Sequence, residues 1–217
     1  MSIKAIEIPL FPLNVVLFPG MVLPLHIFEP RYRQMIADCQ RQELEFGVAL
    51  VQPESIFLRE EPYTIGTMAE IRDLDRLEDG RLNIIAMGTR RFRILSQHRK
   101  KPYLSGLVEL YEDVSEPLDD LLFAHGQARS LFTDYIELLL KAANEKDVKT
   151  DLPADPEALS YFIAYFLDLE KERQQHFLEL TSTLQRLKEE IAILHREVPF
   201  LRHILSKQVS KSRSILN

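Results

Sequence analysis

Residues 8–28 form a stretch of 21 residues without a formal charge, bounded by Glu7 and Glu29. A run of this length and apolarity would suit a membrane-spanning helix. Four prolines interrupt it, however: Pro9, Pro12, Pro19 and Pro24. Each interior proline costs a helix roughly 3 kcal/mol through a lost hydrogen bond and a ring clash, and a secretory signal also needs a helical apolar core. We therefore expect folded, buried and extended chain here.

Turn-forming residues are concentrated in the first half of the chain. Six of the seven glycines and nine of the twelve prolines precede residue 118. Between them, short apolar segments of alternating pattern predict strands over 46–51, 64–71, 81–87, 91–95 and 104–110. Extended pieces around Ile6 and over 22–25 bring the expected total to six or seven strands.

Two local signals refine this half. Asp79-Gly80, between Leu77 and Leu82, predicts a two-residue hairpin loop of type I′, which needs a positive φ at both central positions. Pro30 suits the first position of a helix because its φ is already helical. That helix is expected to bury four side chains, those of Tyr32, Met35, Ile36 and Cys39.

After Pro117 the apolar spacing becomes helical. We expect a helix from residue 118, a second that starts at Pro156 with Asp155 as its cap, and a short one around 170–180. Ser182 and Gln185 form a capping box for the last and longest helix. The predicted fold class is α+β, with a mostly antiparallel β-barrel over residues 1–115 and a helical bundle over 116–217.

The last helix carries a regular apolar stripe. Its members alternate in steps of three and four: Leu184, Leu187, Ile191, Leu194, Val198, Leu201 and Leu205. This spacing is typical of a helix-packing seam, which packs on the preceding helices, forms a homodimer over residues 184–205 or binds a partner helix. Pro199 is expected to kink the helix, and the terminal segment beyond it is basic on an otherwise acidic chain of net charge −6.

The sequence lacks recognisable catalytic and metal-binding motifs. It contains no glycine-rich phosphate loop and no Gly-x-Ser-x-Gly elbow, and its six histidines form no zinc-binding pair. The single cysteine, Cys39, lies on the apolar face of the first helix, where a buried structural thiol is expected. We therefore expect no enzyme activity, no cofactor, no metal and no membrane association, and the lone cysteine suits the reducing cytoplasm.

Two segments are candidate binding surfaces. The first has six basic residues and no acidic one: Arg90, Arg91, Arg93, Arg99, Lys100 and Lys101. It reads either as a solvated strand face paired with acids or as a nucleic-acid-binding surface, although the mild overall acidity makes nucleic acid an unfavoured partner. The second is the apolar triplet Ile56, Phe57 and Leu58 inside a polar loop. These three side chains either fold back on the barrel or bind a protein partner.

Several segments resemble the N-terminal domain of the ATP-dependent protease Lon. They are IPLFPLNVVLFPGMVLPLHIFEPRY at residues 8–32, FGVALV at 46–51, IGTMAEI at 65–71 and IIAMGTRRFRI at 84–94. Their order and spacing match over residues 6–114, and the likeness continues more weakly through the helical half. The family's zinc-bearing cereblon branch is excluded because the chain has no tryptophan and one cysteine.

The resemblance implies a PUA-like, partly closed β-barrel with an appended helical bundle. It also implies a non-catalytic, standalone module that recognises unfolded or specific protein clients, or a protease or chaperone partner, without the ATPase and protease modules of Lon. An RNA-binding PUA-like protein that uses residues 90–101 is the alternative. Log-linear weakening of binding with salt would distinguish the RNA reading.

Overall fold

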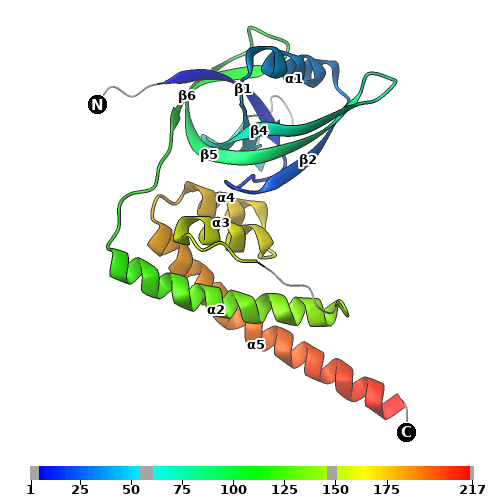
Figure 1. The fold of residues 1–217 in the computed structure, drawn as a ribbon, viewed down its shortest axis with the longest axis vertical. Coiled ribbons are helices and arrows are strands. Elements are labelled where there is room, and N and C mark those ends of the chain that lie inside the picture. The colour runs from blue at the N-terminus through cyan, green and yellow to red at the C-terminus, as the bar shows by residue number, and fades with distance from the viewer. Residues whose placement is uncertain (1–4, 54–60, 146–150, 216–217) are drawn as a thin grey trace. The chain divides into compact units, whose positions relative to one another are not determined.

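The computed structural model describes residues 5–53, 61–145 and 151–215 (Figure 1). The chain divides into two compact units, one of residues 1–113 with 165–181 and one of 114–164 with 182–217. The chain first passes from one unit to the other after residue 113, two residues before the boundary predicted after residue 115. Residues 165–181, expected in the helical domain, instead group with the β unit, because side chains there bond to strands far away in sequence.

The first unit is built on one six-stranded sheet, and the α+β class is confirmed. Its strands are β1 (Ile6–Leu13), β2 (Val22–Ile27), β3 (Phe46–Leu50), β4 (Ile65–Arg76), β5 (Leu82–His98) and β6 (Leu104–Leu110). Their order is β2-β5-β4-β3-β1-β6, and β5 also pairs with β6. Five strands therefore close a ring, while β2 lies outside it on β5. All pairs are antiparallel except β1 with β3.

Strand β5 merges two predicted strands, 81–87 and 91–95, into one of 17 residues. Its first half pairs with β2 and β4, and its second half with β4 and β6. Register shifts interrupt both the β4 and the β6 pairing. Such shifts bend a strand and increase its twist, which lets one strand serve both the ring and the extension that carries β2.

The hairpin between β4 and β5 is confirmed, but its predicted turn type is wrong. Gly80 has a φ of +81°, whereas Asp79 is not among the residues with positive φ. The N–H of Gly80 donates to the carbonyl of Leu77 and the N–H of Leu77 to that of Arg81, both at 2.9 Å. This is the longer loop in which an ordinary turn precedes one left-handed glycine. The carboxylate of Asp79 stabilises it by accepting the Arg81 N–H at 3.0 Å.

Helix α1 (Pro30–Gln42) begins at the predicted proline and buries the four predicted side chains. They join a core cluster that includes Phe11, Phe46 and Ile84 of the strands. The ring centroids of Phe11 and Tyr32 are 4.1 Å apart. A second cluster, which includes Leu10 and Phe92, packs between the strands of the ring. The apolar side chains whose spacing predicted α1 are thus the ones that pack it against the strands.

Helix α4 (Lys171–Glu179) belongs to the first unit. The buried side-chain amide of Gln175 donates to the carbonyl of Ile65 at the start of β4, at 3.0 Å. The hydroxyl of Tyr111 donates to the carbonyl of Glu179 at 3.0 Å. These bonds connect the helix to the barrel.

The second unit contains α2 (Leu118–Ala142), most of α3 (Pro156–Phe166) and α5 (Thr183–Ile215). Asp155 and Ser182 act as the predicted caps, accepting the N–H groups of Ala158 at 2.8 Å and Gln185 at 2.9 Å. The side-chain amide of Gln185 donates to the carboxylate of Glu189. The capping box is therefore only half formed. Helix α5 continues through Pro199. Among the described residues, no helix has the length and apolarity needed to cross a bilayer.

The apolar stripe of α5 is buried along its middle, where α2 and α5 pack together (Figure 1). Leu187 and Leu194 are fully buried there. Leu201 and Leu205, near the end of the stripe, remain half-buried. Homodimerisation through residues 184–205 stays a prediction.

Candidate binding site

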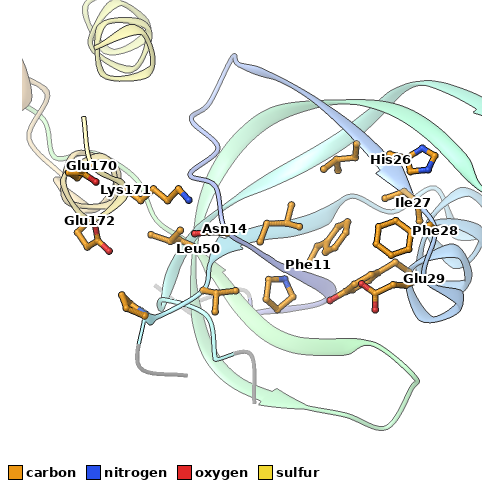
Figure 2. Close-up of a pocket in the computed structure, with 16 residues that line it drawn as sticks. Phe11, Asn14, His26, Ile27, Phe28, Glu29, Leu50, Glu170, Lys171 and Glu172 are labelled. Atoms are coloured by element: carbon orange, nitrogen blue, oxygen red, sulfur yellow. The ribbon is translucent and has the colours of Figure 1, made fainter. Parts of the chain in front are cut away.

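A cavity of about 760 Å³ lies in the first unit. It is bounded by the ends of β1, β2 and β3, by the start of α1 and by the start of α4 (Figure 2). The lining residues are Phe11, Pro12, Leu13, Asn14, Leu25, His26, Ile27, Phe28, Glu29, Tyr32, Leu50, Val51, Pro53, Glu170, Lys171 and Glu172. Its size is within the range of sites that hold small ligands or peptide side chains.

The wall of the cavity is mainly apolar. It includes the turn at the end of the uncharged stretch, where Phe28 keeps 61% of its surface exposed. The ring of Phe28 lies 6.2 Å from that of His26, and the two are stacked. The His26 imidazole is held by the Asn83 side chain at 2.7 Å. An exposed aromatic side chain beside an apolar cavity is typical of a site that a partner covers.

Charged side chains stand at the rim. Glu170, Lys171 and Glu172 come from the start of α4, and Figure 2 shows Lys171 extending toward Asn14. Glu29 stands at the other end and pairs with Arg31 at 2.8 Å. The rim therefore carries three carboxylates and one ammonium group, which favours a ligand with a basic group near its apolar part.

The predicted apolar triplet of Ile56, Phe57 and Leu58 lies outside the described residues. Sequence reasoning did not find the cavity, since its walls come from segments as distant in sequence as Phe11 and Glu172. The available signal was the uncharged stretch 8–28, which supplies eight of the sixteen lining residues. The acidic start of α4 had no recognisable signal.

The basic segment 90–101 is largely used within the first unit. Arg91 is buried, while Arg90 pairs with Glu45 at 3.0 Å and Arg93 with Glu109 at 3.2 Å. Lys101 lies 3.9 Å from Asp38. Arg99 also has an interaction partner, and Lys100 is exposed. Arg90, Arg93 and Lys101 thus lie beside acidic side chains, whereas the burial of Arg91 differs from the expected solvated strand face.

Cys39 is a buried, free thiol, as predicted. Burial, and secondarily the charge of Asp38, raises its pKa to about 12, so the thiolate that a nucleophile requires is scarce. Within the described part of the chain, no three His, Cys, Asp or Glu side chains gather to hold a metal ion.

Comparison with known families matches residues 7–196 to the family described as "ATP-dependent protease La (LON) substrate-binding domain". Among curated proteins, the chain is 30% identical over 193 residues to Lon protease 2 of Desulfotalea psychrophila, covering 88% of this chain and 25% of that protein. It is 27% identical to Lon protease of Escherichia coli, covering 97% and 28%. The chain thus spans about a quarter of the length of these relatives.

Two solved structures are similar in fold. One is the Lon N-terminal domain protein from Xanthomonas campestris, with 28% identity and a TM-score of 0.63, covering 86% of this chain and 98% of that one. The other is the N-terminal domain of Mycobacterium avium complex Lon protease, with 21% identity and a TM-score of 0.64, covering 87% and 98%.

Proposed function

Because the chain belongs to the LON substrate-binding domain family, we propose that it is a non-catalytic module whose first unit binds apolar segments of unfolded or specific protein clients. The observation that carries this proposal is the apolar cavity with Phe28 exposed at its edge. Unfolded proteins expose apolar side chains that native proteins bury, so a half-open apolar cavity selects them.

The proposal is tested by binding of a permanently unfolded protein, reduced and carboxymethylated lactalbumin, measured by fluorescence anisotropy. Phe28→Ala should weaken binding by roughly tenfold or more, since burial of a phenylalanine side chain contributes about 1.5–3 kcal/mol. The matched control is Phe123→Ala, because Phe123 is 77% exposed but lies on α2 of the second unit. Equal affinities of wild type and Phe28→Ala would refute the assignment to this cavity.

RNA binding through residues 90–101 is the alternative, and it is tested by salt. Phosphate recognition by several cations releases counterions, so affinity would fall linearly in a log-log plot against salt concentration. We expect instead that association with the unfolded protein weakens with salt far less steeply than phosphate binding by several cations would. The ion pairs of Arg90 and Arg93 support this expectation.

A further inference from the structure

Strand β2 pairs along one of its two edges, and the other edge has no partner strand among the described residues. It pairs with β5 from Val22 opposite Met87 to Ile27 opposite Leu82. Just before this ladder, the N–H of Gly88 donates to the carbonyl of Met21 at 2.9 Å. Among the strands within residues 5–53, 61–145 and 151–215, none pairs with the other edge of β2.

The direction of each backbone group of β2 follows from this bond. In an antiparallel pair, alternate residues direct their N–H and C=O groups to the partner strand. Met21 faces β5, so Leu23, Leu25 and Ile27 do as well. The three residues between them face the unpaired edge: Val22, Pro24 and His26. The position of Pro24 agrees, because proline has no N–H and is tolerated only where the ladder needs none.

The cavity meets β2 at this unpaired edge. Four consecutive residues, Leu25 to Phe28, line it. Neighbouring side chains of a strand point to opposite faces, so a cavity that contacts consecutive residues borders the backbone rather than one face. The edge of β2 toward β5 is occupied by that strand. The cavity therefore borders the other edge, toward which the N–H and C=O groups of His26 are directed.

Resting on the proposed function, we propose that an extended, apolar segment of a protein client adds to the unpaired edge of β2 as a further strand. Its backbone bonds to the N–H groups of Val22 and His26 and to the carbonyls of Val22, Pro24 and His26. Its side chains enter the cavity, and a Lys or Arg of the segment meets the carboxylates of Glu170 and Glu172. Backbone pairing supplies affinity for many sequences, as required for unrelated unfolded clients, and the rim selects the basic residue.

A synthetic peptide tests the backbone pairing. The probe is acetyl-Gly-Ser-Lys-Val-Phe-Val-Leu-Val-Lys-Ser-Gly-amide. It is compared with two isomers that each carry two N-methyl groups, one on Phe and Leu and the other on the second and third Val. N-methylation removes the N–H, so only the isomer methylated on the residues facing β2 should lose affinity, by about tenfold or more. The other isomer should bind within about threefold of the parent. Replacing both lysines with glutamate should also weaken binding.

Variants of the protein test the same edge. His26→Pro and His26→Ala both remove the imidazole, but only His26→Pro removes the N–H at the unpaired edge. We expect His26→Pro to bind the peptide about fivefold more weakly than His26→Ala. Pro24→Ala adds a donor to this edge and should bind more tightly than wild type. Matching thermal unfolding midpoints of the two His26 variants verify that the ladder with β5 is intact.

The outcomes separate the two proposals. If the parent peptide needs Phe28 but both methylated isomers bind equally, and Pro24→Ala changes nothing, strand addition is overturned while the cavity remains the binding site. If the parent peptide binds wild type and Phe28→Ala equally, the assignment of client binding to this cavity fails. An affinity difference between the isomers together with tighter binding by Pro24→Ala establishes strand addition.

Discussion

The guanidinium group of Arg91 and the carboxylate of Asp113 form a buried ion pair, with side chains only 2% and 10% exposed. The same guanidinium donates to the carbonyls of Leu178 and Leu180, each at 2.7 Å. These carbonyls lie at the C-terminal end of α4 and directly after it. One arginine of β5 therefore links the segment that follows β6 to helix α4, which comes much later in the chain.

Arg91→Ala should lower the free energy of unfolding by about 3–5 kcal/mol, because it leaves Asp113 buried without its partner. Arg93→Ala is the matched control. Its pair with Glu109 is half exposed, and its loss should cost about 1 kcal/mol or less. Urea unfolding measures both, and limited proteolysis should cut residues 165–181 faster only in Arg91→Ala. Equal losses in the two variants would contradict the role given to the buried pair.

Glu190 predicts a pH dependence of the second unit. It is fully buried on α5, and its carboxylate oxygens have no hydrogen-bond partner within the described part of the chain. Burial raises the pKa of Glu190 well above its usual value, although the positive charge of Arg186 acts in the opposite direction. The folded state then holds the proton more tightly than the unfolded state. Stability should therefore fall as pH rises above about 4.5, by at most about 1.4 kcal/mol per pH unit.

Glu190→Gln removes this titration, so its stability advantage over wild type should grow between pH 5 and pH 8. Glu189→Gln makes the same chemical change at the neighbouring, half-buried position and should show no such growth. Urea unfolding across this pH range measures both. A constant difference between Glu190→Gln and wild type would mean that Glu190 titrates normally in the folded protein.

Gly66 on β4 leaves no room for a side chain. A Cβ atom there would lie 2.4 Å from the carbonyl oxygen of Val48 and 2.6 Å from the ring of Phe92. Gly66→Ala should cost about 1–3 kcal/mol or more in unfolding free energy through overpacking. Gly126→Ala, in α2 with nothing within 4 Å, should instead stabilise by up to about 1 kcal/mol. The same sign of change in both would argue against this packing.

Cys39 should react with a maleimide only when the first unit opens. Its side chain is 1% exposed and burial raises its pKa to about 12, so both access and thiolate are lacking at pH 7 to 8. Leu44→Cys in the Cys39→Ser background is the positive control, since Leu44 is 40% exposed. Mass spectrometry should show rapid labelling of that variant, and labelling of wild type only in guanidinium. Rapid labelling of native wild type would exclude the closed core.

The sequence alone determined the features that local rules govern. Pro30 and the apolar positions after it defined α1 and its buried face, because both the proline φ and the helical period act within a few residues. The caps Asp155 and Ser182 were predicted for the same reason. The four prolines of residues 8–28 excluded a helix before any fold was known. The family resemblance carried by these segments predicted the barrel.

Only the tertiary structure decided the features that depend on contacts between residues far apart in the sequence. The turn at Gly80 took another form because the loop is one residue longer than the dipeptide suggested. Arg91 appeared as one of six basic residues, and its burial follows from Asp113 and the end of α4. The cavity likewise needs Phe11, Phe28 and Glu172 in one place. Periodicity and propensity describe neighbours along the chain, whereas the free energy of these arrangements comes from contacts across it.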